Sequence, residues 1–75
     1  MTDVELLKQK ILESGLKVTF IAKECGLSPQ GFYNKRDGKT EFTQSEIIGL
    51  KKLLKLTSEE VEEIFFTIKV DKTST

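Results

Sequence analysis

Residues 18–39, VTFIAKECGLSPQGFYNKRDGK, are the most informative part of the sequence because they predict two short helices around a tight turn. Apolar or small side chains recur at helical spacing through its first third and predict a helix over 18–25. Gly26 then ends that helix, because glycine readily adopts the left-handed conformation found at helix ends. Ser28 suits an N-cap and the proline after it suits a first turn, so a second helix is expected over 29–37.

The second helix has an apolar anchor and a polar outer side. If Phe32 faces inward, a step of about 100° per residue turns Gln30, Tyr33 and Asn34 outward. Amide side chains pair bidentately with adenine in the major groove of DNA, and a phenol can contact a phosphate or a thymine methyl group. An ordinary solvated helix face would account for the same residue types. Basic residues close by favour DNA, because they suit its phosphate backbone.

The segment resembles the helix-turn-helix of Cro and phage repressors, the lambda-repressor-like family. Ala22, four residues before Gly26, matches the close helix crossing of that family. The string FYNKRDGKTEFTQSEI resembles the end of the recognition helix and the following loop in short repressor-like proteins of prophages. The similarity spans roughly residues 6–65. It implies an all-α, five-helix domain that binds an operator as a dimer, with helix 29–37 in the major groove and half-sites about 34 Å apart.

The resemblance also assigns candidate roles to individual residues. Three residues are expected to read bases: Gln30, Tyr33 and Asn34. Six are expected to hold the DNA backbone: Lys17, Ser28, Lys35, Arg36, Lys39 and Thr40.

Four positions depart from the family pattern. Lys17 stands where a small polar residue usually caps the helix, and Lys35 and Arg36 stand where an apolar anchor of the last turn is common. Phe20 occupies a position that usually faces solvent. Here we expect it to pack in the core, on the C-terminal helix or on a partner.

Length and composition set further limits. The 75 residues allow one small domain, assigned to 1–71, with a disordered tail at 72–75. One cysteine and no histidine provide neither an internal disulfide nor a zinc site, and Cys25 is interpreted as a small buried hydrophobe. We therefore expect no catalytic residues, no metal, no other cofactor and no small-molecule substrate. Nothing resembles a signal peptide or a membrane span, so a cytoplasmic protein is expected.

Charge is unevenly distributed although its formal sum is zero. Basic residues predominate over 17–39, and glutamates predominate after residue 56. A basic side attracts phosphate, and an acidic side opposite to it would hold DNA to one orientation. A chain that is 32% charged also produces such patches by chance.

The remaining helices are delimited by capping signals. Thr2 with Glu5 predicts a first helix over 3–14, in which Val4, Leu7, Ile11 and Leu12 share one side. Two further boxes, Thr43 with Glu46 and Thr57 with Glu60, predict helices over 44–55 and 58–66.

After the last helix, Phe66, Ile68 and Val70 alternate with polar residues. This period of two predicts a short strand that pairs with its copy in a homodimer; a frayed tail is the equal alternative. The leading hypothesis is a sequence-specific transcriptional regulator that resembles the Cro-like repressors of prophages. The second is an antirepressor-like module of the same fold that binds a partner repressor in place of DNA, which the zero net charge and the alternating apolar segment favour.

Overall fold

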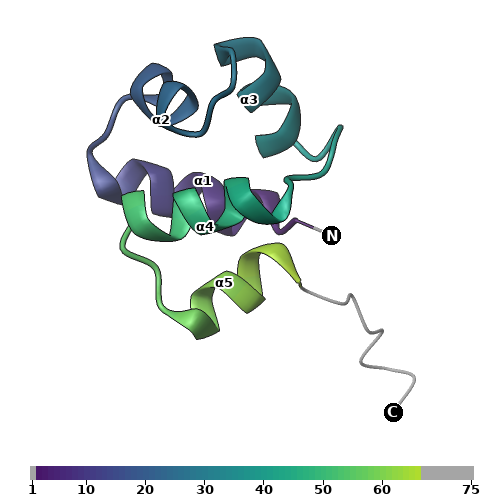
Figure 1. The fold of residues 1–75 in the computed structure, drawn as a ribbon. Coiled ribbons are helices and arrows are strands. Elements are labelled where there is room, and N and C mark those ends of the chain that lie inside the picture. Colours follow the sequence, from purple (N-terminus) through teal and green to yellow (C-terminus); the bar gives the residue numbers. More distant parts are fainter. Residues whose placement is uncertain (1, 67–75) are drawn as a thin grey trace.

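The computed structural model describes residues 2–66, which form five α-helices and no strand (Figure 1). The all-α prediction is therefore confirmed for this part of the chain. The predicted strand over 66–70 lies outside the described residues except for Phe66, which is the C-cap of the last helix, and the expected tail at 72–75 lies outside them entirely. The helices are α1 (Val4–Ser14), α2 (Val18–Glu24), α3 (Pro29–Arg36), α4 (Gln44–Leu53) and α5 (Ser58–Phe65).

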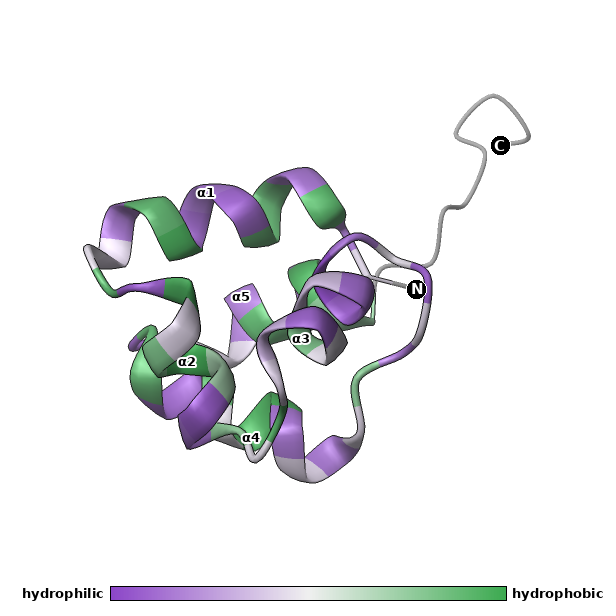
Figure 2. Ribbon diagram, turned by 90° about the horizontal axis from the view of Figure 1, so that it is seen from above, coloured by the Kyte–Doolittle hydropathy of each residue, from purple (hydrophilic) through white to green (hydrophobic). Residues whose placement is uncertain are grey.

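The helices are stacked in three tiers. In Figure 1, α2 and α3 lie at the top, α1 and α4 cross the middle, and α5 lies at the bottom. Contacts join α2 to α3 and α4, α1 to α3 and α5, and α4 to α5. Seen from above in Figure 2, α3 lies over the space between α1 and α4 and shows hydrophilic segments along its length. The α2–α3 pair thus caps one end of the molecule, away from α5.

An aromatic chain runs through the core from one end to the other. Phe32 of α3 packs edge-on against Phe42, with ring centroids 5.9 Å apart. Phe42 packs in the same way against Phe65 of α5, at 5.5 Å. Such pairs add about 0.5–1.5 kcal/mol each to the effect of burial. The interior is completed by other buried side chains, among them Leu7, Ile21, Leu50 and Ile64.

The predicted caps at three helix starts are confirmed. Ser28 Oγ accepts a hydrogen bond from the backbone N–H of Gly31 at 3.1 Å. Thr43 and Thr57 each form a complete capping box with the glutamate three residues later. These bonds satisfy backbone donors that a helix start leaves without partners.

The predicted capping box of Thr2 and Glu5 is wrong. Asp3 is the N-cap of α1, and its carboxylate accepts from the N–H of Leu6 at 3.1 Å. The backbone N–H of Asp3 bonds the carbonyl of Ile64 at 2.6 Å and so attaches the start of α1 to α5. The cap is therefore shifted by one residue relative to the prediction.

Two apolar residues are exposed. Leu12, which was predicted to be inside, is 82% exposed. Phe20 is 45% exposed, so the expectation of core packing is wrong, while packing on a partner stays a prediction. Each lies next to a buried residue, Ile11 and Ile21 respectively, but about 100° further round its helix. Among the described residues, no element packs over Leu12 or Phe20 closely enough to bury it.

α1 ends at Ser14 as predicted, but the other four helix ends fall one or two residues short of the predictions. The helices predicted to end at 25, 37 and 66 end one residue earlier, and the one predicted to end at 55 ends at Leu53. At the last site the backbone turns: Lys55 has a positive φ of 55°, which closes α4 and directs the chain towards α5. No described helix is both long and apolar enough to cross a membrane.

Candidate nucleic-acid interface

The connection between α2 and α3 is a glycine-closed turn. Gly26 has a φ of 74°, in the left-handed region that favours glycine. Its N–H bonds the carbonyl of Lys23 at 3.0 Å, and the N–H of Leu27 bonds that of Ala22 at 2.9 Å. These two bonds make a Schellman motif, in which the last carbonyls of the helix find donors. Ser28 then caps α3 directly, so the connection between the two helices is a short, hydrogen-bonded turn.

The turn presents α3 with its polar side outward. Among its described residues, Phe32 is buried and Gln30 is exposed, while Tyr33 and Asn34 are half-buried. We call Gln30, Tyr33 and Asn34 the outer face of α3. Gln30 Nε2 donates a hydrogen bond to Asn34 Oδ1 at 3.2 Å, one helical turn apart. The structure therefore brings together the two amides that were predicted to read bases.

The segment after α3 folds back and forms backbone hydrogen bonds with Asn34. The backbone carbonyl of Asn34 accepts from the N–H of Lys39 at 2.9 Å and from that of Thr40 at 3.4 Å. Both side chains are exposed. Two predicted phosphate contacts are thus held close to a predicted base contact.

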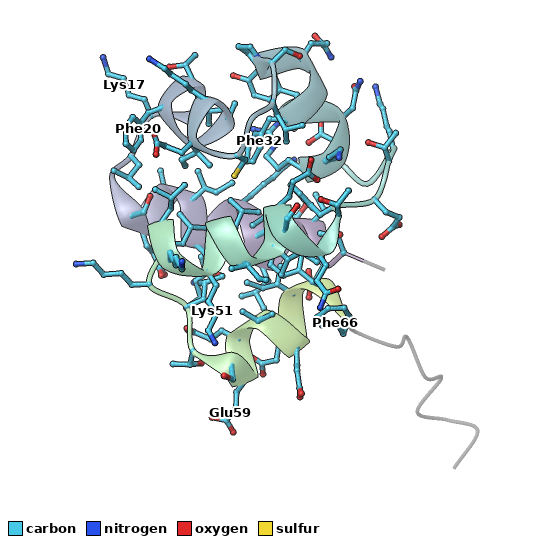
Figure 3. All side chains as sticks on the ribbon, viewed as in Figure 1. Lys17, Phe20, Phe32, Lys51, Glu59 and Phe66 are labelled. Atoms are coloured by element: carbon cyan, nitrogen blue, oxygen red, sulfur yellow. The ribbon has the colours of Figure 1, made fainter. Side chains whose placement is uncertain are left out.

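Lys17 lies at the start of α2, at the same end of the molecule as α3 (Figure 3). It is the N-cap of α2, makes no side-chain capping bond and is exposed. Figure 3 shows it at the outer end of α2, pointing away from the core. As expected from the sequence, Lys17 is a weak cap, and its side chain lies on the surface. Ser28 is also exposed, and its hydroxyl hydrogen remains available because the cap uses the oxygen as an acceptor.

Arg36 is held against neighbours of its own segment. Its guanidinium lies 4.7 Å from the ring centroid of Tyr33, and its Nε is 3.0 Å from Asp37 Oδ1. The same carboxylate lies 4.0 Å from Lys8 Nζ of α1. The hydrogen bond from Arg36 lowers the pKa of Asp37 more than partial burial raises it. Arg36 thus remains near the outer face of α3, but its charge is partly neutralised.

Lys35 differs from the other predicted backbone contacts. Its Nζ lies 2.6 Å from Oε1 of Glu46, and the two side chains are 17% and 12% exposed. Burial alone would raise the pKa of Glu46, but the bonds from Lys35 and Thr43 outweigh burial and lower it. The ammonium is therefore directed towards α4 and not towards open solvent. The pairing of Glu46 with Lys35 was not predicted from the sequence, because a capping box with Thr43 already accounted for a glutamate at this position.

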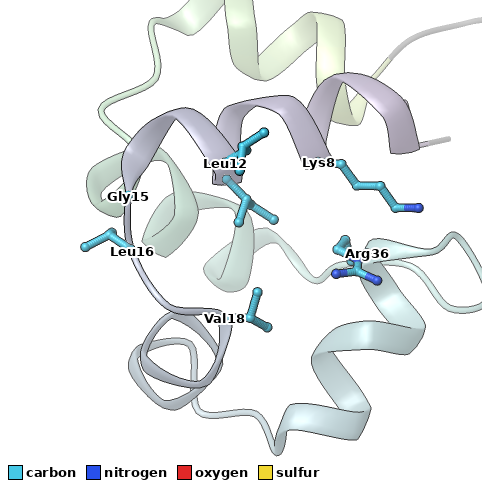
Figure 4. A pocket seen from close by; sticks show the side chains of 7 residues that line it. Lys8, Leu12, Gly15, Leu16, Val18 and Arg36 are labelled. Atoms are coloured by element: carbon cyan, nitrogen blue, oxygen red, sulfur yellow. The ribbon is translucent and has the colours of Figure 1, made fainter.

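An open groove runs beside α3, between α1 and the start of α2, with a volume of about 480 Å³ (Figure 4). Apolar side chains line it, and the cations of Lys8 and Arg36 lie at one end. The exposed Leu12 belongs to its lining.

The single cysteine is not part of this surface chemistry. Cys25 is half-buried next to the core, and burial raises the pKa of its thiol. A thiol with a raised pKa is a poor nucleophile at neutral pH. Within residues 2–66, no group of histidine, cysteine or acidic side chains has the arrangement of a metal site.

No family model, curated protein or solved structure matches the chain.

Proposed function

We propose that the protein is a sequence-specific, double-stranded DNA-binding transcriptional regulator, in which α2 and α3 act as a lambda-repressor-like helix-turn-helix. One observation carries the proposal. A short helix, fixed from below by Phe32, presents the hydrogen-bonded amides of Gln30 and Asn34. Exposed cationic and hydroxyl side chains, Lys17 and Thr40 among them, lie around it.

The amide pair suits adenine. Asn34 Oδ1 has two lone pairs, of which Gln30 occupies one, so the oxygen can still accept from the exocyclic amine of adenine. The Asn34 amide nitrogen would donate to N7 of the same base. The bond from Gln30 limits rotation of the Asn34 amide, which lowers the entropy lost when a base is bound. Tyr33 would contact a phosphate or a thymine methyl group beside it.

Backbone contacts would fix the register of α3 in the groove. The side chains proposed to bind phosphates are Lys17, Ser28, Arg36, Lys39 and Thr40. Such contacts carry no sequence information but supply much of the affinity. Lys35 has the weakest support of the predicted contacts, because its ammonium would first have to leave Glu46.

Binding as a dimer would place one α3 in each half-site. The proposed dimer surface is α5 with Phe66, which is 57% exposed, and the following Ile68 and Val70, which lie outside the described residues. The same features favour the second candidate, an antirepressor-like module. Glu59 and Phe66 are exposed on α5, at the opposite end from α3 (Figure 3).

Two experiments in sequence separate the two candidates. Bound sequences are first selected from a random duplex pool, and the selected duplex is then titrated into the protein while its chemical shifts are followed. DNA binding predicts shifts in α3, in residues 37–43 and at Lys17. Shifts confined to α5, with α3 silent, would contradict the proposal and favour the protein-binding module. Sedimentation of the same sample tests the dimer.

A further inference from the structure

One carboxylate oxygen joins the two ends of the segment that follows α3. Glu46 Oε1 accepts the Lys35 ammonium at 2.6 Å and the backbone N–H of Thr43 at 2.8 Å. Lys35 belongs to the last turn of α3, and Thr43 is the residue directly before α4. The segment 37–43 is therefore closed across its base by a single side chain.

The closed segment contains the groups that the proposed function uses. Within it, Lys39 and Thr40 donate their backbone N–H groups to the carbonyl of Asn34. Asn34 lies one residue before Lys35, so a displacement of the end of α3 would move the amide and both phosphate contacts together. The low exposure of the Lys35 and Glu46 side chains strengthens the bond between them, because solvent screens it less than an exposed pair.

We propose that Glu46 is a positioning residue: by holding Lys35 and Thr43, it sets the geometry of the outer face of α3 and of the phosphate contacts at 39–40. The inference rests on the proposed function and deepens it. Glu46 would not touch DNA. Its role in recognition would be exerted through Lys35, which becomes an internal brace and not a phosphate ligand.

The chain supplies a matched control at its other end. Glu60 also completes a capping box, accepting from the N–H of Thr57 at 2.8 Å. It also holds a lysine from another helix, Lys10 Nζ at 2.6 Å. This second brace joins α1 to α5, remote from α3 (Figure 1). Both glutamates thus combine a capping box with a lysine from another helix, although Glu60 binds its lysine through Oε2 and its cap through Oε1. They differ mainly in what the bound lysine fixes.

The sign of the effect on DNA binding distinguishes positioning from simple electrostatics. Removing a carboxylate near DNA lowers repulsion, and a released Lys35 would gain a phosphate; both effects would tighten binding to every sequence. Loss of positioning instead weakens binding to the selected operator more than to an unrelated duplex. The quantity to measure is therefore the ratio of the two affinities at one salt concentration.

The experiment compares Glu46→Gln, Lys35→Met, the double variant and Glu60→Gln. Glutamine keeps an oxygen for the Thr43 or Thr57 N–H but removes the charge. We expect the specificity ratio to fall about tenfold for Glu46→Gln and for Lys35→Met, and no further in the double variant, because both changes remove the same ion pair. Glu60→Gln should leave the ratio within about twofold of the unmodified chain.

Hydrogen exchange provides a measurement that needs no DNA. In Glu46→Gln and Lys35→Met, exchange of the Lys39 amide should accelerate more than that of the core amide of Leu50; in Glu60→Gln the two should change in parallel. A specificity ratio that is unchanged or raised in Glu46→Gln overturns the inference. If the unmodified chain selects no duplex, the proposed function fails. The brace is then tested by hydrogen exchange alone: an equal acceleration of the Lys39 and Leu50 amides in Glu46→Gln would overturn it.

Discussion

The helices α3 and α5 each contain eight residues and lie at opposite ends of the molecule, but they are held differently. α5 buries Ile64 and Phe65, and α1 is attached to it through Lys10 and through the backbone of Asp3. Among the described residues of α3, Phe32 is the buried one, and its last turn is held by Lys35. The side chains that α3 leaves exposed or half-buried include the two amides of its outer face, whereas the exposed residues of α5 are Ser58 and three glutamates.

The largest expected effect concerns the apolar anchor of α3. Phe32→Ala should reduce the free energy of unfolding by about 3–5 kcal/mol, because the ring is fully buried and packs on Phe42. In the monomer, Phe66→Ala, at the exposed C-cap of α5, should change it by less than about 0.5 kcal/mol. Urea denaturation measures both. If Phe32→Ala unfolds the chain outright, Phe32→Leu gives a measurable intermediate loss; equal effects of Phe32→Leu and Phe66→Ala would contradict the comparison.

The next effect concerns binding by the outer face of α3. Asn34→Ala should weaken binding to the selected operator by about 1–3 kcal/mol and relax specificity at one base pair. Lys39→Ala should weaken all sequences alike and reduce the slope of log affinity against log salt by about 1. Lys52→Ala, exposed on α4, is the control and should do neither. Unchanged operator binding by Asn34→Ala would show that the reading residues are assigned wrongly.

The smallest effect is the pH dependence of the two braces. The bond from Lys10 is the main cause of the lowered pKa of Glu60, and the pKa of Glu46 is lowered despite its burial. Because folding depresses both values, the stabilisation is present above the ordinary glutamate pKa of about 4.3 and is lost as the pH falls through the folded values. The urea midpoint should therefore fall on acidification, and less steeply in Glu46→Gln and Glu60→Gln. An identical slope in all three chains would contradict this account.

Sequence reasoning located the helices more accurately than the directions of their side chains. The starts of α2 to α5 were predicted correctly, and those of α3 to α5 depend on the caps Ser28, Thr43 and Thr57, which act within three residues. Leu12 was placed inside because it follows an apolar series, yet α1 buries Leu7 and Ile11 and leaves Leu12 in the groove. Which side of a helix is covered depends on elements that are distant in the chain.

Local sequence signals were sufficient to predict five helices, the glycine-closed turn at Gly26 and the polar outer face of α3, because these follow from hydrogen bonds and periodicity among near neighbours. The second partners of Glu46 and Glu60 and the exposure of Phe20 instead depend on how the helices pack. Lys10 and Glu60 are separated by 50 residues, and Lys35 and Glu46 by 11. An ammonium pairs with whichever carboxylate packing brings within reach, and that distance is set when the helices are stacked.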